Sequence, residues 1–411
     1  MLSKKDPEKP VTLIITTICG GGHLQTAKAM KGLIEANQPE ARVIEIDIFN
    51  DWFGKYLGAF FTQCWNQPLR KGQNLILLAY AYLGIPLADP ILFLPIFIQS
   101  FLTFYRLPVT RIIDTQPVGN CATTLAVYLT NKLKKKQLKI EKILTEIPTA
   151  LAFHFYHPLK LLPTALRNLI EFQVASPLPE QADFFFKHAK LNSWQIKTIQ
   201  PPLRHAFFEK EALSDPHLTL HFSSEREKEE VLRIGQLHTL ITCEQPLSCQ
   251  IHLDAKIHLT TIMLGSQPQI RLQIAYLDKL YQLALKEDLK KHHVIIVLGN
   301  HRIEKWKSLI EIWLERPPIK FFHPVLLTAQ PEGTVAKLLK RSHRTITRSG
   351  GLTAMELLQS EQQHALIHTD TIRKNQPVLK KMPPWEIGNA QVLMKTLGAR
   401  ITNPDYLEEL E

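Results

Sequence analysis

The stretch Val11-Thr-Leu-Ile-Ile-Thr-Thr-Ile-Cys-Gly-Gly-Gly-His23 sets the fold of the first half of this chain. It opens with a short run that is apolar and β-branched, as is typical of a buried parallel strand. The residues after His23 space their apolar side chains for one face of a helix. Between strand and helix, Gly21 and Gly22 would let backbone N–H groups approach an anion at the helix N-terminus. A tight turn that needs glycine for its dihedral angles is the alternative interpretation.

A second strand–glycine–helix sequence lies near the C-terminus, at Arg348, Ser349, Gly350 and Gly351. The backbone amides, the dipole of the following helix and the hydroxyl groups of Ser349 and Thr353 would favour a phosphate there. Arg348 can add a charge-assisted hydrogen bond. A second glycine turn of this kind favours the phosphate interpretation for both turns.

Two further positions extend the phosphate interpretation. Glu356, one turn into the helix, has the acceptor atoms that a ribose diol needs, and the alternative is a capped helix with Glu356 exposed to solvent. The turn Gly265-Ser266-Gln267 ends the first strand of the second half. Ser266 is a natural helix N-cap and could equally bind an oxygen of a diphosphate.

Strand-like and helix-like segments alternate in both halves of the chain, which is typical of βαβ units in a parallel sheet. Residues 215–258 break this alternation with a charged run and several short pieces. We therefore expect an α/β protein with two doubly wound, Rossmann-like lobes that face each other across a cleft. Residues 1–205 would form the first lobe, residues 206–258 a linker or insertion, and residues 259–411 the second lobe.

The composition limits the classes of partner. The 411 residues carry a formal net charge of +11, which favours an anionic membrane surface, a nucleotide or a nucleic acid. The sequence has no zinc-finger spacing and no RNA-recognition signature, so we expect no nucleic-acid partner. The five cysteines are scattered without a Cys-x-x-Cys pair, which predicts a reducing compartment, no disulfide scaffold and no zinc site. Because no signal-peptide pattern is present, we expect a cytoplasmic protein, peripheral to the membrane if it binds one.

The segment 75–105 is strongly apolar, but Asp89 and three prolines interrupt it. A membrane-spanning helix needs about 20 uninterrupted apolar residues. The segment instead predicts two apolar helices that either pack in a core or dip into one leaflet. The basic run at 132–142 is either a solvated helix face or a contact with anionic lipid. Four more basic residues flank the apolar segment and keep the membrane interpretation open: Arg70, Lys71, Arg106 and Arg111.

These blocks, in this order, resemble two-lobed GT-B glycosyltransferases of the family that includes monogalactosyldiacylglycerol synthase and the N-acetylglucosaminyltransferase that completes lipid II. Residues 348–356 and the turn 265–267 are similar to donor-site segments of the lipid II branch. Residues 382–390 resemble the family's sugar-binding Gln-Glu-x-Gly-Asn segment. The other similar blocks, matching the glycine loop of the first lobe and parts of the galactolipid branch, are residues 20–23, 145–146, 155–158 and 201–204.

The resemblance implies an inverting hexosyltransferase that moves a sugar from a nucleotide sugar, most often a UDP sugar, to a lipid or lipid-linked acceptor. Such enzymes generally use no cofactor and no built-in metal. They need a base for the acceptor hydroxyl, and the candidates are His23 and Glu146. Tyr156 and His157 would lie on the acceptor side.

The same resemblance implies a donor site. Glu356 would hold the ribose, and Glu386 and Asn389 would hold sugar hydroxyls. The other residues that would bind the donor are Gly21, Gly22, Arg204, Gly265, Ser266, Gln267, Arg348, Ser349, Gly350, Gly351 and Thr353.

Three substitutions depart from the family pattern. Trp385 replaces a glutamine, which removes a sugar contact and adds a stacking face; Glu146 replaces an aspartate; and Pro268 replaces a glycine. Two alternatives therefore stay open. One is a non-catalytic GT-B-like protein that binds a nucleotide sugar or a membrane. The other is a sugar-nucleotide epimerase, which shares the two-lobe fold but uses no acceptor.

Overall fold

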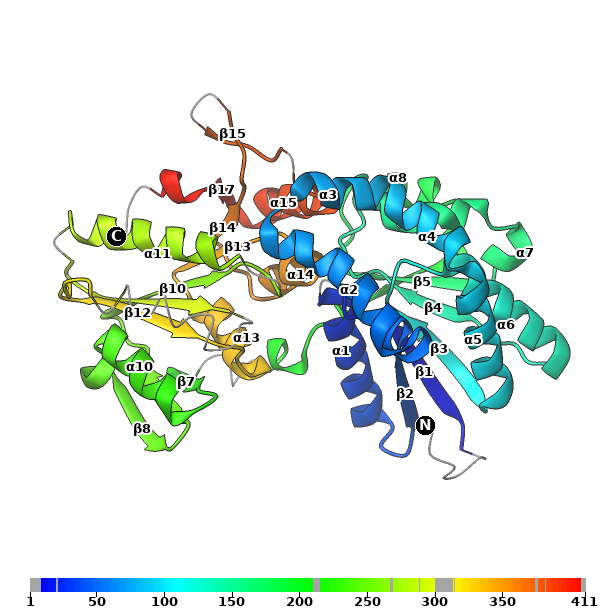
Figure 1. The fold of residues 1–411 in the computed structure, drawn as a ribbon, viewed down its shortest axis with the longest axis horizontal. Coiled ribbons are helices and arrows are strands. Elements are labelled where there is room, and N and C mark those ends of the chain that lie inside the picture. The colour runs from blue at the N-terminus through cyan, green and yellow to red at the C-terminus, as the bar shows by residue number, and fades with distance from the viewer. Residues whose placement is uncertain are drawn as a thin grey trace. The chain divides into compact units, whose positions relative to one another are not determined.

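The computed structural model describes residues 9–19, 21–209, 215–266, 269–287, 289–299, 313, 315–373, 376–380 and 382–407. The chain forms two compact units. The first contains Met1–His205 together with two short segments from the C-terminal half, Gly350–Met355 and Pro383–Asn389. The second contains Ala206–Ser349, Glu356–Met382 and Ala390–Glu411. Each unit is built on its own six-stranded sheet (Figure 1).

The sheet of the first unit has the strand order β2-β1-β3-β4-β5-β6, and every pairing in it is parallel. The β-branched run that opens the glycine-turn sequence forms β1, and all its residues are buried, as expected for a strand covered on both faces. The strands are β1 (Val11–Thr16), β2 (Arg42–Asp47), β3 (Val109–Asp114), β4 (Ile140–Ile143), β5 (Ile170–Ala175) and β6 (Ile196–Ile199).

Helices cover both faces of this sheet. On one face α1 (Gly22–Asn37) packs Met30 and Ile34 against Ile14 of β1. On the other face α5 (Phe93–Arg106) and α6 (Asn120–Lys134) pack against β1 and β3, with Ile96 and Val127 in the shared core. The shorter helices of this part of the chain are η1 (Ile48–Trp52), η3 (Phe153–Leu161), α7 (Thr164–Arg167), α8 (Ala182–His188), η4 (Ser193–Gln195) and η5 (His205–Phe207).

The apolar segment forms two helical stretches, as predicted. The first runs without a break through α3 (Asn74–Ala79), η2 (Tyr80–Gly84) and α4 (Ile85–Ile91), and α5 follows after Leu92. By length and composition alone, Asn74–Ile91 is long enough and apolar enough to cross a membrane. Asp89, however, is buried and accepts hydrogen bonds from the backbone N–H groups of Gly119 and Asn120 at the start of α6, at 2.6 and 3.1 Å. These bonds hold the stretch against the rest of the unit, next to α2 (Gly54–Lys71).

The second unit contains the other parallel sheet, with the order β12-β11-β10-β13-β14-β17. Together the two sheets confirm the predicted α/β class with two doubly wound, Rossmann-like lobes. The strands are β10 (Ile257–Met263), β11 (His292–Leu298), β12 (Phe322–Leu327), β13 (Arg344–Thr347), β14 (Ala365–His368) and β17 (Arg400–Thr402). The helices and the minor strand pair are α11 (Ile270–Ala284), α13 (Glu332–Arg341), α14 (Gly351–Gln359), α15 (Pro384–Leu397), η7 (Pro404–Tyr406), β15 (Ile372–Arg373) and β16 (Gln376–Pro377).

The segment predicted as a linker or insertion carries a small sheet of its own, with the order β7-β9-β8 and antiparallel pairings. A disulfide joins Cys243 of β8 to Cys249 of β9. The expectation that the scattered cysteines stay reduced is therefore wrong for this pair, which a hairpin brings together. The elements are β7 (His217–His221), α10 (Glu225–Gly235), η6 (Leu237–Thr239), β8 (Ile241–Gln245) and β9 (Ser248–His252).

Candidate functional site

The two glycine turns lie at the positions where each sheet reverses its direction of growth. In the first unit β2 lies on one side of β1, whereas β3 and the strands that follow it extend the sheet on the other side of β1. In the second unit the same reversal occurs between β10 and β13. Ligands of doubly wound sheets bind outside the carboxyl ends of the strands at such a switch point. The loop before α1 follows β1, and the loop before α14 follows β13, so both turns are in this position.

His23 is fixed at the switch point of the first unit. Gly21 precedes α1 with a left-handed φ of 83°, which a glycine adopts without strain. The Nδ1 atom of His23 lies 2.6 Å from the carbonyl oxygen of Thr115, the residue that follows β3. The hydroxyl of Thr145, beyond β4, lies 3.2 Å from the same nitrogen. Three neighbouring strand ends therefore meet at this imidazole.

The contact with Thr115 decides which nitrogen of His23 carries the proton. A carbonyl oxygen can only accept, so Nδ1–H donates and the neutral ring has its lone pair on Nε2. Burial lowers the pKa of His23 to about 4, against the opposing effect of the Thr115 hydrogen bond, and the positive charge of Lys142 lowers it further. His23 is therefore a neutral imidazole at physiological pH, with Nε2 free to accept a proton.

Glu146 meets two segments that are far away in the sequence. Asn389 donates from Nδ2 to Glu146 Oε2 at 2.7 Å, and its Oδ1 accepts from the backbone N–H of Ile147 at 3.2 Å. A Cβ on Gly351 would lie 2.0 Å from the Thr145 carbonyl oxygen. The turn after β4 is thus closed over by the starts of α14 and α15. It brings the predicted residues Glu146, Gly351 and Asn389 together.

The environment of Glu146 favours its protonated form. Burial raises the pKa of this carboxyl to about 8, the hydrogen bond from Asn389 opposes the rise, and the charge of Glu386 adds to it. The two candidate bases consequently differ in charge state near pH 7. His23 is neutral with a free lone pair, and Glu146 is predominantly a neutral carboxylic acid.

A buried ion pair lies beneath these loops, and sequence reasoning missed it. Lys142 of β4 donates to Asp114 Oδ2 of β3 at 2.7 Å and also to the carbonyl oxygen of Gln116, and each of the paired side chains is 1% exposed. Lys142 belongs to the basic run interpreted as a solvated face or a lipid contact, and for this residue both interpretations are wrong. The available signal was its place at the start of a strand-like segment, residues 142–145.

The acceptor-side candidates have different environments. Tyr156 is fully buried and packs edge-on against Phe172, in the core around β5. It is a core residue, so its assignment to an acceptor site does not hold. His157 is partly buried beside Phe153. Burial, followed by the charges of Lys160 and His188, lowers the pKa of His157.

In the second unit the predicted phosphate turns follow neighbouring strands. Met263 of β10 pairs with Thr347 of β13, and the Thr347 hydroxyl donates to the Met263 carbonyl oxygen at 2.6 Å. Gly265, with a φ of 84°, and Ser266 follow the first strand, and Arg348 and Ser349 follow the second. These turns therefore share one edge of the sheet. Gln267 and Pro268 lie outside the described residues.

The remaining donor-site candidates lie on α14, on α15 or at the unit boundary. Glu356 is buried on α14, and Glu386 and Asn389 are buried on α15. Thr353, in the first turns of α14, and Arg204 are partly buried. A Cβ atom added to Gly350 would meet no atom of the described residues within 4 Å, and the same holds for Gly22.

Trp385 does not offer the free stacking face that the sequence suggested. Its ring is buried and stacks on Trp65 of α2, with a centroid distance of 6.2 Å and an interplanar angle of 19°. Trp65 stacks in turn on Tyr80 of η2. Gly388, one turn further on, approaches Thr149 so closely that a Cβ would lie 2.1 Å from its hydroxyl oxygen. Trp385 therefore anchors the start of α15 to the first unit.

Comparison with known proteins gives a likeness of fold. No family model matches the chain, and no curated protein matches it. Among solved structures, MurG from Acinetobacter baumannii is 13% identical, covering 97% of this chain and 87% of its own, with a TM-score of 0.44. A UDP-GlcNAc 2-epimerase from Neisseria meningitidis is 13% identical, with coverages of 96% and 95% and a TM-score of 0.44. An α,α-trehalose-phosphate synthase (UDP-forming) from Burkholderia xenovorans is 11% identical, with coverages of 97% and 89% and a TM-score of 0.48. The fold assignment itself rests on the strand order of the two sheets.

Proposed function

We propose that this chain is an inverting glycosyltransferase that moves a sugar from a nucleotide sugar, UDP-linked, to a hydroxyl group of a lipid or lipid-linked acceptor. The observation that carries the proposal is the hydrogen bond from His23 Nδ1 to Thr115, because it leaves Nε2 unprotonated at a switch point. A neutral imidazole with a fixed orientation is suited to accept a proton from an alcohol. The second glycine turn, at the other switch point, supports a phosphate-bearing donor.

His23 rather than Glu146 is the proposed base. As the acceptor oxygen forms a bond to the anomeric carbon, its proton passes to His23 Nε2. The bond between that carbon and the diphosphate oxygen breaks, and the nucleoside diphosphate leaves with the electron pair. Glu146, held protonated, is better suited to hydrogen-bond a neutral group than to take this proton.

The leaving diphosphate needs electrostatic stabilisation as its charge develops. In the proposed site, Ser266, Ser349, Gly350, Thr353 and the basic residues Arg204 and Arg348 provide it through hydroxyl, backbone N–H and guanidinium groups. Glu356 would hold the ribose, and Glu386 and Asn389 the sugar.

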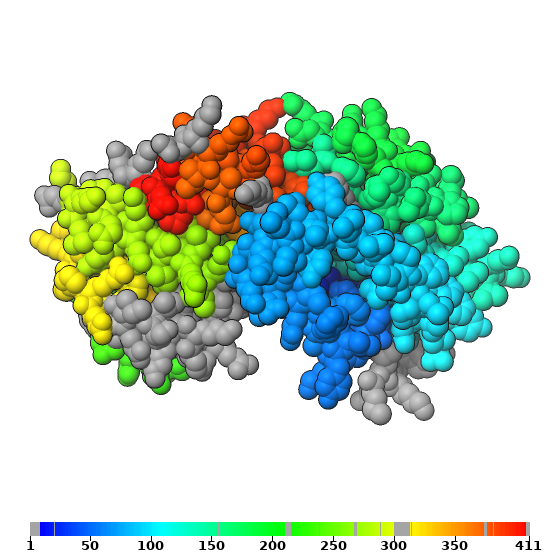
Figure 2. All heavy atoms as spheres, turned by 45° about the horizontal axis from the view of Figure 1, so that its top comes forward, coloured from blue at the N-terminus to red at the C-terminus, as the bar shows by residue number. Residues whose placement is uncertain are grey.

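An apolar surface on the helices around Asn74–Ile91 supports a lipid acceptor and favours a transferase over an epimerase. Figure 2 shows these helices at the molecular surface in blue and light blue. Large exposed apolar surfaces mark protein or membrane contacts. Because Asp89 ties the stretch to α6, the helices would lie in one leaflet and would not cross the bilayer. The exposed apolar side chains of these helices include Tyr56, Leu57 and Phe60 of α2, Leu75, Ile76, Tyr82, Leu83, Leu87 and Ile91 of the stretch, and Leu94 and Ile98 of α5.

Three basic residues near this surface already have partners within the protein. Arg111 makes a bidentate ion pair with Glu141, with Nε 2.7 Å from Oε1 and Nη2 2.6 Å from Oε2, so its charge is already compensated. Lys134 lies over the ring of Tyr105 at 4.1 Å from the centroid. Lys136 donates to the carbonyl oxygen of Val109 at 3.1 Å. Lys71 and Arg106 are the proposed contacts with lipid head groups.

Calorimetry with UDP tests the donor half of the proposal. A methyl group at Gly350 meets no described atom within 4 Å, so Gly350→Ala should fold normally but obstruct a phosphate that approaches the backbone. Gly333→Ala, at another open glycine at the start of α13, is the matched control. We expect UDP to bind the wild type and G333A equally and G350A about tenfold more weakly. No heat with UDP or any other nucleoside diphosphate would refute the donor site.

Transfer from a panel of radiolabelled nucleotide sugars to extracted membrane lipids tests the reaction. We expect label in the lipid fraction with release of an equal amount of UDP. His23→Gln should lower the rate by about 10²–10⁴-fold. Glu146→Gln, which mimics the protonated acid, should keep most of it.

Other outcomes of the same experiment identify the alternatives. Transfer only to protein or to a soluble acceptor would refute the lipid part. Solvent deuterium entering the nucleotide sugar without any acceptor would identify an epimerase. UDP binding without turnover, unchanged by either substitution, would identify a non-catalytic binding protein.

A further inference from the structure

The carbonyl group that fixes the tautomer of His23 belongs to the peptide between Thr115 and Gln116, which is trans. Its oxygen lies 2.6 Å from His23 Nδ1. On the other side of the same peptide, the N–H group of Gln116 donates to Asp114 Oδ1 at 3.0 Å. In a trans peptide the C=O and N–H bonds lie in one plane and point in opposite directions. The carboxylate that holds the N–H group therefore also directs the C=O group toward His23.

Lys142 holds this carboxylate from the neighbouring strand. Its Nζ donates to Asp114 Oδ2 at 2.7 Å and also to the carbonyl oxygen of Gln116. One ammonium group thus binds the residues on both sides of Thr115. All four residues are buried, with exposures of 1% or less, so bulk water does not compete for these hydrogen bonds.

The other contacts of Thr115 fix its position but not the direction of its carbonyl group. Its backbone N–H donates to the carbonyl oxygen of Ile15 at 3.0 Å, and its hydroxyl donates to the carbonyl oxygen of His23 at 3.2 Å. The peptide that follows can still turn about the Cα–C bond of Thr115. The hydrogen bonds made by Asp114 and Lys142 oppose that turn.

The second neighbour of His23 Nδ1 does not select a tautomer. The hydroxyl of Thr145 lies 3.2 Å from this nitrogen, and a hydroxyl can donate as well as accept. If the Thr115 carbonyl turned away, Thr145 could donate to Nδ1. The proton of the neutral ring would then be on Nε2, which could no longer take a proton from an alcohol. The direction of one peptide therefore decides whether Nε2 can act as a base.

We propose that Asp114 and Lys142 are positioning residues for His23 and that they act on it through the Thr115–Gln116 peptide. In a Ser-His-Asp triad the carboxylate keeps the imidazole in the correct tautomer by a direct hydrogen bond. Here one peptide unit lies between the carboxylate and the imidazole. The inference rests on the proposed role of His23 as the base, and it adds what keeps this base in its working tautomer.

Two double variants separate this role from the charge of the ion pair. Asp114→Leu with Lys142→Met removes both charges and also the acceptor for the Gln116 N–H group. Asp114→Asn with Lys142→Met removes the same charges but keeps an Oδ1 atom that can accept. If leucine does not fit and the first variant fails to fold, Asp114→Ala with Lys142→Met is the second variant without an acceptor.

The tautomer of His23 is measured from the ¹⁵N chemical shifts of its ring in labelled protein without substrate. Its signals are assigned by their loss in His23→Gln. At pH 7 the ring is neutral, because its pKa is about 4. We expect the Nδ1–H tautomer in the wild type and in the variant with asparagine. In the variant with leucine, both ring signals should shift toward the Nε2–H tautomer.

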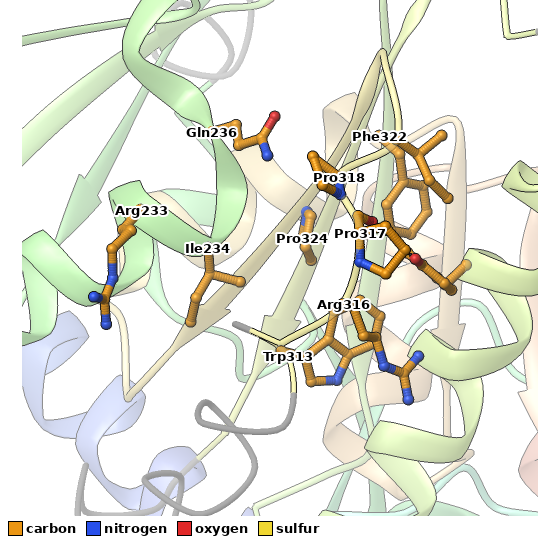
Figure 3. Close-up of a pocket in the computed structure, with 11 residues that line it drawn as sticks. Arg233, Ile234, Gln236, Trp313, Arg316, Pro317, Pro318, Phe322 and Pro324 are labelled. Carbon is orange, nitrogen blue, oxygen red and sulfur yellow. Dashed lines mark hydrogen bonds between the residues drawn. The ribbon is translucent and has the colours of Figure 1, made fainter.

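A loss of stability alone should not move these signals. Phe322 belongs to the core of the second unit and lines a small pocket there, which contains no residue of the His23 network (Figure 3). Phe322→Leu should lower the thermal midpoint and leave His23 in the Nδ1–H tautomer. An unchanged tautomer in the folded variants without an acceptor, or an equal shift in the variant with asparagine, would overturn the proposal.

Transfer kinetics give a second measurement. We expect kcat to be at least about tenfold lower in the variant with leucine than in the variant with asparagine, with the same KM for the nucleotide sugar. Equal kcat values despite a shifted tautomer would also overturn the proposal. If the wild type transfers no sugar from any nucleotide sugar, the proposed function fails. The measurement of the tautomer needs no substrate, so it still decides whether Asp114 and Lys142 orient His23.

Discussion

Lys142 and Asp114 form a fully buried ion pair, 2.7 Å from Nζ to Oδ2, directly beneath the loops that carry His23 and Glu146. Removing one partner leaves the other charge buried without compensation. We expect Lys142→Met to lower the free energy of unfolding by about 3–5 kcal/mol, measured by urea denaturation.

Two variants control this measurement. Lys197→Met removes a pair of the same length with Glu171, but Lys197 is exposed, so the loss should stay below about 1 kcal/mol. The double change Asp114→Leu with Lys142→Met should recover a large part of the stability. If Lys142→Met and Lys197→Met have the same small effect, the buried pair is not a charged pair.

The pH dependence of transfer should report the lowered pKa of His23. The proposed base is active when neutral, and its pKa of about 4 keeps it neutral well below pH 6.5. We expect kcat/KM to stay level between pH 7 and 5 and to fall near pH 4, with thermal midpoints recorded at each pH to exclude unfolding. An acid limb centred at 6.5 in a fully folded enzyme would contradict this role.

Gly351 should be far less replaceable than its neighbour Gly350. A Cβ at 351 would lie 2.0 Å from the Thr145 carbonyl oxygen and 2.5 Å from Glu146 Oε2, and neither is free to retreat. We expect Gly351→Ala to lower the free energy of unfolding by about 1–3 kcal/mol and Gly350→Ala to leave it within about 0.5 kcal/mol. Equal effects would mean that the start of α14 does not pack on the turn after β4.

The exposed apolar helices should bind lipid vesicles. Leu83 and Ile91 are 62% and 71% exposed, so replacing both with glutamine should not disturb folding. Each apolar side chain transferred into a leaflet contributes about 1.5–3 kcal/mol, so flotation with anionic vesicles should fall at least about tenfold. The matched control is the pair Leu285→Gln and Met394→Gln, which is also exposed but lies in the second unit. Equal loss in both doubles would rule out a specific membrane face.

Acid should destabilise the second unit through a histidine pair at the amino end of its sheet. His323 Nδ1 donates to the Gly235 carbonyl oxygen at 2.8 Å, so its Nε2 must accept from His292 Nδ1 at 2.9 Å. Burial lowers the pKa of His323, with a further contribution from His292. A lowered pKa means that the unfolded chain binds the proton more readily, so stability is retained above pH 6.5 and lost as the pH falls below it.

The corresponding measurement is the thermal midpoint at pH 7.5 and pH 5. We expect His323→Gln to show a smaller acid-induced drop than the wild type. His364→Gln, at an exposed histidine near the same edge, should show the wild-type drop. A wild-type drop in His323→Gln would place the acid sensitivity elsewhere.

The sequence allowed the two parallel sheets and their switch-point turns to be predicted, because glycine clusters and β-branched runs are local signals. Strand limits were less accurate: the strand expected at residues 142–145 is β4, Ile140–Ile143. Thr145 and Glu146 leave the sheet to form the loop over which α14 and α15 close. The sequence contains no local signal for side chains that contact each other from distant parts of the chain. Asn389 and Glu146 are 243 residues apart, and nothing in either segment indicates the other.

Buried charge and covalent pairing were also beyond local reasoning. Lys142 looks like one more lysine in a basic run, and only the fold puts Asp114 beside it. Cys243 and Cys249 lack a familiar spacing, yet the β8–β9 hairpin joins them.

The starts of α14 and α15 belong to the first unit, while the rest of both helices belongs to the second. Cutting the chain between the two halves would therefore divide the first unit. A truncated chain ending near His205 would lack the partners of Trp65 and Glu146, and would expose the surfaces that Trp385 and Asn389 cover. Expression of either half alone should give insoluble material, and co-expression of the halves should be needed to recover a soluble product.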